Sequence, residues 1–324
     1  MKRLMVSLEN RTERQSNIRR PANLLASGFQ VFLSLLWGGN HVSIKVSLEY
    51  APPMQVGWLR FVLGGFITLG YMVLKKESFK IAKTEMGPVF FIGLLFTVQI
   101  IFMNMGQFYT TAGHATALNA TYPIWAAVIA NFVVPNDRLT RWKIVAIMFS
   151  YLGILVLVLK DSNDAVVGVS VHGDILSLIS AALLGFRLVL MSNFAQKMSE
   201  IKIMYGQLVM GTILLLAASQ LFENPVWSLK TGFLLSLAYQ GFVIAGFGFL
   251  ANAWLLKKYL PSTITFFSFV QPPAGVLFAW MVLNEDPGSG LLVGLLLIVM
   301  GAIVYGGEAY LNSMKQRLNK GNLS

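Results

Sequence analysis

The stretch WGGNHVSIKVSLEYAPPMQVGWLRF, residues Trp37 to Phe61, places a lysine and an arginine inside two long apolar runs that are separated by a short turn. Comparable runs of about 20 apolar residues recur along the whole chain, and each is long enough to cross the hydrocarbon core of a bilayer. The 324 residues are 56% hydrophobic and only 12% charged, whereas about a quarter of the residues in a soluble domain are charged. The chain is therefore predicted to be a polytopic membrane protein.

Ten apolar runs are predicted to be transmembrane helices. Helices are expected because a helix satisfies its own backbone hydrogen bonds in lipid, and the period-2 alternation of barrel strands is missing. The runs cover approximately residues 24–47, 54–74, 86–108, 112–134, 141–159, 173–196, 202–222, 231–256, 262–283 and 289–309. The links are short and contain turn residues, as in Asp286-Pro287-Gly288. The predicted fold class is all-α and polytopic, with no room for a soluble domain.

The lysines and arginines are distributed unevenly between the two ends of the predicted helices. Most of the 25 fall in segments that are cytoplasmic if the N-terminus is cytoplasmic, and positively charged loops stay on that side. We therefore expect cytoplasmic tails at residues 1–22 and 311–324 and a location in the bacterial inner (plasma) membrane. Topology accounts for the formal net charge of +11, so the expected partner of these charges is the lipid bilayer and not nucleic acid.

The chain also contains a weak internal repeat. A shift of 149 residues superposes Pro123 on Pro272 and Asp137 on Asp286. The predicted organisation is a five-helix half at 23–160, an outer linker at 161–172 and a second five-helix half at 173–310. Because five is an odd number of crossings, the second half must be inverted relative to the first. Two inverted repeats around a central cavity are typical of transporters that work by alternating access.

Two stretches of the chain resemble a known family. The spacing W-G-x6-K-x6-PP-x6-R, from Trp37 through Lys45 to Arg60, resembles the first two helices of EamA-type families in the drug/metabolite transporter superfamily. The stretch GHATALNATYPIWAAVIANFVVPNDRLT resembles the fourth helix of that family, although Asn136-Asp137 replaces the usual Gly-Glu pair in the turn. The resemblance implies a ten-helix transporter fold. It leaves the cargo open, because relatives of this kind export amino acids and other small metabolites, or exchange sugar phosphates and nucleotide sugars.

Three cationic side chains lie inside the predicted spans: Lys45, Arg60 and Arg187. A charge at the bilayer centre costs about 2.5–3.5 kcal/mol, so such a side chain should face protein or water. The acidic residues nearest to the spans lie at span ends, and they are Glu49, Asp174 and Glu308. The predicted cavity is therefore electropositive, which favours anionic or zwitterionic cargo and disfavours lipophilic cations.

Each cation also has a structural explanation. Lys45 is near the outer end of its helix, so its ammonium group could snorkel to the interface. Arg60 lies about 9 Å below the outer end of its helix, where it could bind a carboxylate or phosphate, or cap backbone carbonyls at a broken helix. Arg187 is deeper and is the cation that snorkelling explains least.

The first predicted helix has one polar face. Trp37, His41 and Lys45 are spaced four residues apart and Asn40 borders them, so this face is expected to line the transport path. Other polar residues in the spans are candidate substrate contacts, although each alone is more typical of a hydrogen bond between helices. They are Gln99, Asn104, Asn119, Tyr122, Gln207, Gln240, Asn252 and Gln271. The prolines expected to kink or break helices and to act as hinges are Pro123, Pro272 and Pro273.

Enzyme chemistry is not predicted. The chain has no cysteine, no His-Glu metal-binding helix motif and no phosphate-binding glycine loop, so neither a metal nor another cofactor is expected. His41 is interpreted as the near-neutral titratable group on the polar face, because His114 and His172 fall in predicted outer connections. Facilitated efflux or exchange is therefore preferred to proton coupling.

The favoured function is export or exchange of small anionic or zwitterionic metabolites, with amino acid export first. Three alternatives remain: a multidrug or lipophilic-cation exporter, a sugar-phosphate or nucleotide-sugar exchanger, and a non-transporting membrane receptor or scaffold. The expected partners are a small-molecule substrate and the lipid bilayer. The oligomeric state stays open and includes a monomer.

Overall fold

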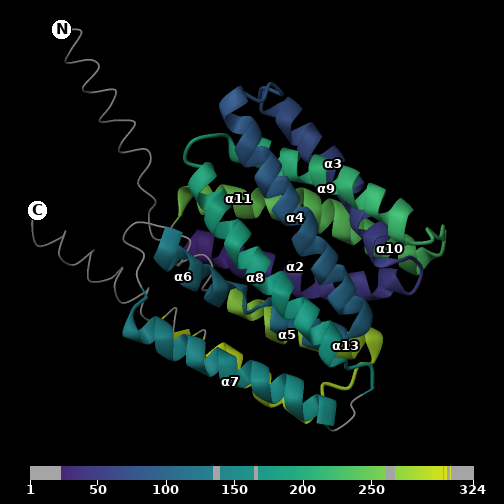
Figure 1. Cartoon of the computed structure of the whole chain (residues 1–324), viewed down its shortest axis with the longest axis vertical. Coiled ribbons are helices and arrows are strands. Elements are labelled where there is room, and N and C mark those ends of the chain that lie inside the picture. Colours follow the sequence, from purple (N-terminus) through teal and green to yellow (C-terminus); the bar gives the residue numbers. More distant parts are fainter. Residues whose placement is uncertain are drawn as a thin grey trace, which may run out of the picture.

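The computed structural model of the protein describes residues 23–133, 139–163, 167–259 and 267–301, together with residues 303, 304 and 307. Its regular elements are helices of very different lengths (Figure 1). The predicted tails at 1–22 and 311–324, the Asn136-Asp137 turn and Glu308 lie outside the described residues.

The helices of the first half follow from local sequence signals. They are α2 (Leu24–Leu48), α3 (Pro53–Leu74), α4 (Lys83–Tyr109), α5 (Ala112–Asn119), α6 (Tyr122–Val133) and α7 (Arg141–Asn163). Asn23 is the N-cap of α2, because its side chain accepts a hydrogen bond from Ala26 N at 2.9 Å. Pro53 opens α3, where its missing N–H group has no helical partner to lose.

The second half contains a long segment with an unusual middle. Its elements are α8 (Val171–Phe194), α9 (Glu200–Phe222), α10 (Thr231–Ala238), η1 (Tyr239–Gly248), α11 (Phe249–Lys258), η2 (Phe267–Val270), α13 (Gln271–Leu283) and an apolar helix at Ser289–Gly301. α10, η1 and α11 form one continuous helical segment, and η1 is a π-helix of 10 residues. π-helices are rare and are mostly single turns that occur at functional sites.

Six helices of the described chain are long and apolar enough to cross a membrane. They are α3, α4, α7 as far as Asp161, α8, α9 and the continuous segment Thr231–Lys258. The prediction of an all-helical polytopic membrane protein is confirmed at this level. α13 and Ser289–Gly301 are apolar but shorter, and the predicted fourth span is divided between α5 and α6.

Loops and helix ends rich in lysine gather at one end of the helices, which we call the basic end. Lys202 at the start of α9 donates to the backbone oxygen of Lys80 at 3.1 Å and to Glu85 Oε2 at 3.3 Å. Lys257 in the last turn of α11 pairs with Glu200 in the first turn of α9. These contacts bring the start of α4, the start of α9 and the end of α11 together.

Two carboxylates, Glu223 and Glu285, join the halves at the other end of the helices, which we call the opposite end. Glu285, two residues after α13, accepts hydrogen bonds from the backbone N–H groups of Ala112 and Gly113 at the start of α5. Glu223 accepts hydrogen bonds from Met54 N at 2.7 Å and Gln55 N at 3.0 Å. Both N–H groups belong to the first turn of α3, where they have no partner within the helix and where a negative charge also interacts favourably with the helix dipole. The end of α9 is therefore fastened to the start of α3.

Glycines allow α2, α5 and α13 to pack closely. A Cβ atom added to Gly38 of α2 would lie 3.0 Å from the Cβ atom of Ala274 in α13, and one added to Gly275 would lie 2.2 Å from Thr116 Cγ2 in α5. A larger residue at position 275 would force α5 and α13 apart, whereas one at position 38 would require its neighbours in α13 to shift slightly. This packing fills the space among the three helices between the centre of the molecule and the opposite end.

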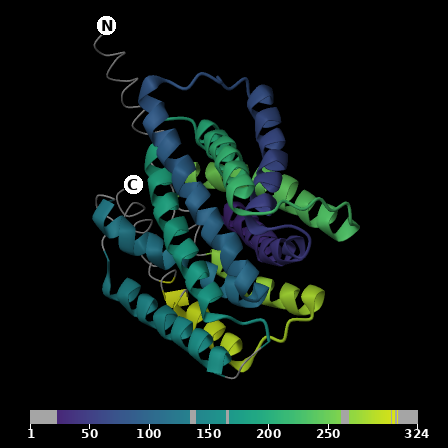
Figure 2. The same ribbon diagram turned by 45° about the vertical axis from the view of Figure 1, so that its right-hand side comes forward.

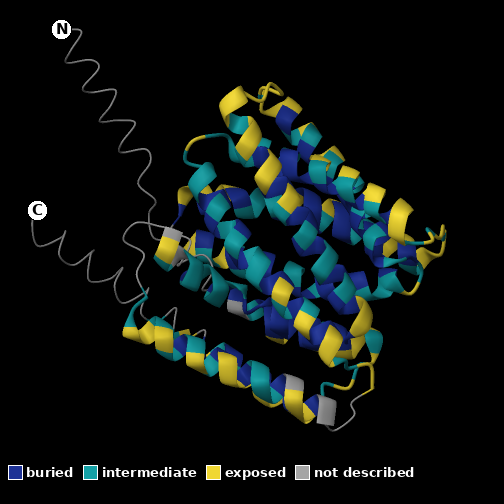
Figure 3. Cartoon of the chain, in the orientation of Figure 1, coloured by how far each residue is buried: buried dark blue, intermediate teal, exposed yellow. Residues whose placement is uncertain are grey.

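The helix α7 lies along one flank of the molecule beside Ser289–Gly301 (Figures 1 and 2). The two helices touch where a Cβ atom on Gly153 would lie 2.7 Å from the backbone oxygen of Gly294. Exposed residues run along the outer side of α7 (Figure 3) and include Ile144, Met148 and Leu152. Such apolar exposure is expected of a surface that faces hydrocarbon.

Candidate functional site

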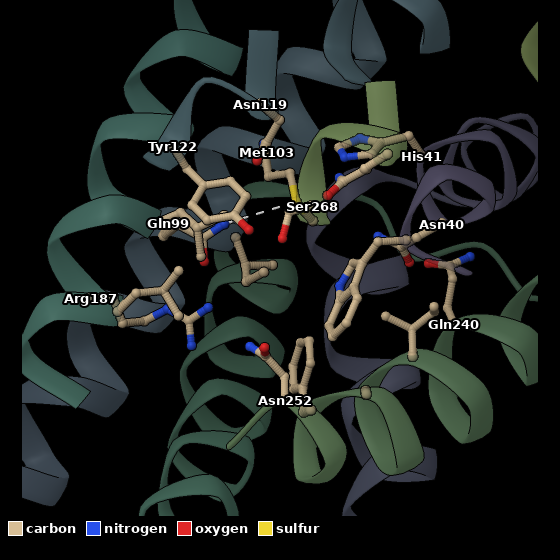
Figure 4. A pocket seen from close by; sticks show the side chains of 18 of the residues that line it. Asn40, His41, Gln99, Met103, Asn119, Tyr122, Arg187, Gln240, Asn252 and Ser268 are labelled. Atoms are coloured by element: carbon tan, nitrogen blue, oxygen red, sulfur yellow. Dashed lines mark hydrogen bonds between the residues drawn. The ribbon is translucent and has the colours of Figure 1, made fainter. Parts of the chain in front are cut away.

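A cavity lies at the centre of the molecule, where helices of both halves meet. It contains about 890 Å³ of space not occupied by atoms, including its opening. The lining residues come from α2, α3, α4, the α5–α6 junction, α8, α9, η1, α11, η2 and α13. Residues far apart in the sequence therefore share one chamber, which is lined by both polar and apolar side chains (Figure 4).

Most of the predicted contact residues line this cavity. They are Trp37, Asn40, His41, Arg60, Gln99, Asn119, Tyr122, Arg187, Gln207, Gln240, Asn252 and Gln271. Three polar residues that the sequence analysis did not single out also line it: Gln30, Ser34 and Ser268. Gln30, Ser34, Trp37 and His41 follow one another at helical spacing on α2, so the periodicity of that face could have identified the first two.

Two candidate residues lie outside the lining. Lys45 donates through Nζ to the backbone oxygens of Gln107 at 2.8 Å and Thr110 at 2.5 Å. These are carbonyls at the end of α4, where a cation is favoured by the helix dipole. Asn104 donates through Nδ2 to the backbone oxygen of Pro53 at 2.8 Å and therefore joins α4 to the start of α3.

Arg187 of α8 is a buried cation with neutral partners. Its side chain is 6% exposed, and Nη1 donates to Gln207 Oε1 at 2.8 Å. Nη1 also lies 3.8 Å from the sulfur of Met191, while Nε has no hydrogen-bond partner. A guanidinium group carries five N–H donors, so these contacts leave most of its hydrogen-bonding capacity free for a ligand.

Arg60 of α3 is buried in a similar way. It is 3% exposed, its Nη2 atom donates to Asn104 Oδ1 at 3.4 Å, and Nε has no partner. Its guanidinium carbon lies 4.7 Å from the centre of the Phe61 ring, and that of Arg187 lies 4.9 Å from the centre of the Phe96 ring. The two rings are themselves 4.7 Å apart. Aromatic faces thus support both cations without neutralising them.

No aspartate or glutamate is found among the described residues that line the cavity. A buried cation normally has an acidic partner, because transferring a charge from water to protein carries a large desolvation cost. Neutral side chains here compensate only part of that cost. The cavity is therefore electropositive and suited to a ligand that brings its own negative charge.

The fourth predicted span is interrupted at the cavity. α5 ends at Asn119 and α6 begins at Tyr122, so Pro123 lies in the first turn of a new helix. Pro272 likewise lies in the first turn of α13, after the short 3-10 helix η2. Proline fits the start of a helix because its fixed backbone angle is already helical. The breaks place Asn119, Tyr122 and Gln271 at the cavity wall.

The position of His114 differs from the prediction that it lies in an outer connection. It belongs to α5 and is buried, with Nδ1 3.0 Å from Asp174 Oδ2 and Nε2 3.0 Å from Asp161 Oδ2. Asp161 lies in the last turn of α7. The burial of His114 has a long-range cause, because α5 turns inward between α7 and α8 and carries His114 with it. His172 lies in the first turn of α8.

Within the described residues, no group of three or more His, Asp or Glu side chains could hold a metal ion. The side chains that line the cavity include arginine, amide and aromatic groups, which can bind a small molecule.

The sequence profile of the EamA-like transporter family matches residues 25–159 and 171–306. The chain belongs to the EamA-like transporter family. It is therefore an integral membrane transporter with two EamA domains, and not an enzyme. The resemblance seen in the sequence is confirmed, and the two domains meet around the cavity described above.

Individual relatives are distant but cover most of the chain. The uncharacterized transporter YoaV of Bacillus subtilis (strain 168) is 23% identical over 84% of this chain and 93% of its own length. A Salmonella typhimurium protein named "Probable amino-acid metabolite efflux pump" is 25% identical over 84% and 93%. The S-adenosylmethionine/S-adenosylhomocysteine transporter of Chlamydia muridarum is 23% identical over 88% and 93%.

A solved crystal structure has the same fold. It superposes with a TM-score of 0.68 at 18% identity and covers 88% of this chain and 98% of its own. At this identity the likeness concerns the fold alone.

Proposed function

We propose that this EamA-family protein exports or exchanges small anionic or zwitterionic metabolites, with amino acids as the first candidates. The observation that carries the proposal is the pair of buried guanidinium groups, Arg60 and Arg187, in a cavity whose described lining contains no acidic residue. A carboxylate ligand would supply the missing partner through charge-assisted hydrogen bonds, which are about twice as strong as neutral ones.

The cavity chemistry argues against lipophilic cations as cargo. A cationic drug would have to enter beside two buried arginines without an acidic side chain to offset the repulsion. The same arginines are compatible with sugar phosphates or nucleotide sugars. The cavity wall also contains many apolar side chains, including Leu184, Leu188, Met191, Met204 and Phe249. These suit an organic side chain better than a polyhydroxylated sugar, which favours amino acids over phosphate esters.

The named relatives support the same cargo class. The Salmonella relative is named as a probable amino-acid metabolite efflux pump, and the Chlamydia relative as a transporter of S-adenosylmethionine and S-adenosylhomocysteine. S-adenosylhomocysteine is a zwitterionic amino acid derivative, whereas S-adenosylmethionine carries an additional sulfonium charge. At 23–25% identity they are weak guides to cargo. Their value is that they agree with a preference already inferred from the cavity.

The proposed mechanism is alternating access, in which the cavity opens in turn to each side of the membrane. The proposed architecture has ten membrane crossings arranged as two inverted repeats. The close packing of α2, α5 and α13 and the contacts of Glu223 and Glu285 are interpreted as the closed gate of one state. The helix breaks before Pro123 and Pro272 are the proposed hinges. We assign the basic end to the cytoplasm because positively charged loops are retained there. The proposed membrane is the bacterial inner membrane.

The test is transport by purified full-length protein in proteoliposomes. Counterflow is measured with radiolabelled amino acids, dicarboxylates, sugar phosphates and one lipophilic cation, tetraphenylphosphonium. We expect counterflow of at least one amino acid, and we expect it to disappear in Arg187→Ala vesicles that contain the same amount of folded protein. Counterflow of tetraphenylphosphonium alone would instead identify a multidrug exporter. Binding without counterflow of any compound would identify a receptor.

A further inference from the structure

The wall of the cavity that faces Arg187 contains two buried amide side chains. Asn40 comes from α2 and is 4% exposed, and Gln240 comes from the start of η1 and is 0% exposed. Both line the cavity, and Figure 4 shows them on one side of it with Arg187 on the other. The Oδ1 atom of Asn40 and the Oε1 atom of Gln240 have no hydrogen-bond partner.

The orientation of the Gln240 amide is determined by its neighbours. Its Nε2 atom donates to the backbone oxygen of Ser43 at 3.1 Å and to Ser47 Oγ at 2.7 Å. A backbone carbonyl can only accept a hydrogen bond, so the nitrogen must face Ser43 and the oxygen must face away from it. The Oε1 atom is thus a buried acceptor held in place without a donor, which is an unfavourable arrangement unless a ligand supplies one.

The π-helix η1 positions Gln240 rigidly. The residue before it, Tyr239, donates through its hydroxyl group to the backbone oxygen of Leu36 at 2.7 Å. The residue after it is Gly241, where an added Cβ atom would lie 2.4 Å from Leu63 Cβ and 3.1 Å from the backbone oxygen of Arg60. Contacts with α2 on one side and α3 on the other therefore hold this turn between the two helices. A preorganised acceptor of this kind is typical of a binding site.

We infer that Asn40 and Gln240 form the subsite for the positively charged amino group of the cargo, while the arginines bind its carboxylate. The inference rests on the proposed function and deepens it: the cargo is a zwitterionic amino acid and not a simple organic acid or phosphate. An ammonium group carries three donors and no acceptor, so it matches carbonyl oxygens that lack donors.

Neutral amides suit this subsite better than a carboxylate would. An acidic side chain facing Arg187 across an empty cavity would attract the guanidinium and compete with the cargo for it. Amide oxygens accept the ammonium group without neutralising the arginines. The two walls are therefore able to recognise opposite charges on one ligand.

The experiment compares each amino acid with the same molecule lacking its amino group. Purified full-length protein is titrated with the standard L-amino acids. The amino acid that binds most tightly is then compared with the acid that lacks its amino group; for L-phenylalanine, this acid is 3-phenylpropanoate. We expect the deaminated acid to bind at least tenfold more weakly. In Gln240→Met and Asn40→Leu, the amino acid should lose at least tenfold in affinity while the deaminated acid changes less than twofold.

Two further variants separate recognition from folding. Asn40→Asp keeps an acceptor but adds a carboxylate that competes with the cargo for the arginines. It should therefore weaken both ligands, and the deaminated acid more strongly, because only the amino acid has an ammonium group that is attracted to the new charge. Gln107→Met removes a buried amide outside the cavity lining, one that donates to the backbone oxygen of His41 at 2.8 Å. It should leave the affinity ratio between the two ligands unchanged.

The outcomes distinguish the subsite from the proposed function. Equal binding of both ligands to the unmodified protein, or an unchanged affinity ratio in Gln240→Met, would overturn the amino-group subsite. If both ligands bound equally to the unmodified protein and Arg187→Ala abolished the binding of both, the proposed function would stand with organic acids as cargo. Failure of every amino acid and every deaminated acid to bind would overturn both.

Discussion

Buried charges occur in two regions of this transporter, and they are satisfied in opposite ways. At the opposite end, both ring nitrogens of His114 face carboxylates, Asp161 and Asp174, at 3.0 Å. The Asp161 oxygens also accept from the backbone N–H groups of Gly290 and Leu291, each at 2.7 Å. In the cavity, Arg60 and Arg187 have neutral partners and each leaves its Nε atom unpaired.

This difference separates the charges that stabilise the fold from those that are available to bind a ligand. A carboxylate that accepts two N–H groups at the start of a helix and also binds a histidine has little capacity left for another partner. His114 comes from the first EamA domain and Asp174 from the second, while Asp161 follows the first domain at the end of α7, so this cluster joins the domains. The cavity arginines are the reverse case, because their partners are neutral and both residues line the cavity.

Removing a cavity arginine should have the largest effect. Arg60→Ala and Arg187→Ala are each expected to lower cargo counterflow about a hundredfold or more, since truncating a buried charge-pair contact costs about 2–5 kcal/mol. Counterflow in proteoliposomes, normalised to folded protein, measures this. Arg187→Lys is the matched control and should recover part of the activity, because it keeps the charge but loses the bidentate geometry. Unchanged flux in both alanine variants would contradict the conclusion that the cavity arginines bind the cargo.

Breaking the His114 cluster should act on stability instead. His114→Ala leaves Asp161 and Asp174 buried without their shared partner, and unpaired buried charges of this kind cost about 3–5 kcal/mol. Thermal unfolding of the detergent-purified protein should show a clearly lower midpoint, while cargo affinity of the remaining folded protein stays the same. His172→Ala provides the control: its ring packs on Tyr109 at 5.0 Å between centroids, and its loss should shift the midpoint little. Equal shifts of the unfolding midpoint in His114→Ala and His172→Ala would contradict the special structural role of the His114 cluster.

Weakening a single helix cap should have a moderate effect. Glu285 accepts hydrogen bonds from Ala112 N at 2.8 Å and Gly113 N at 3.0 Å, at the start of α5. Glu285→Gln removes the charge and one acceptor and should cost about 1 kcal/mol, as the loss of an N-cap typically does. Glu223→Gln at the start of α3 should cost a similar amount. Thermal unfolding that is unchanged in both variants would show that neither carboxylate holds the opposite end together.

Lys45 should give the smallest effect of the cations in the spans. Its ammonium group is engaged by the carbonyls at the end of α4, outside the cavity lining. Lys45→Met keeps the apolar stem and is therefore expected to change the KM of cargo counterflow less than about threefold, since a helix-end cation contributes about 0.3–1 kcal/mol. A loss of flux comparable with that of Arg187→Ala would place Lys45 with the substrate-binding cations after all.

Much of the architecture could be predicted because its signals are local. A run of apolar residues is visible in any short window, and the positions of Asn23 and Pro53 marked where α2 and α3 begin. The polar face of α2 was equally visible, since helical spacing places Trp37 and His41 on one side. The sequence showed Arg60 and Arg187 inside apolar segments, but not that each would lie against a phenylalanine ring.

The sequence by itself determined an all-helical membrane protein of the EamA-like transporter family with cations in its apolar segments, because helix formation and membrane insertion depend on neighbouring residues. Only the tertiary structure decided which charges are paired. His114 meets partners 47 and 60 residues away along the chain, and the π-helical turn that aims Gln240 at the cavity depends on contacts with α2 and α3. Such pairings follow from the packing of distant helices, which no local pattern specifies.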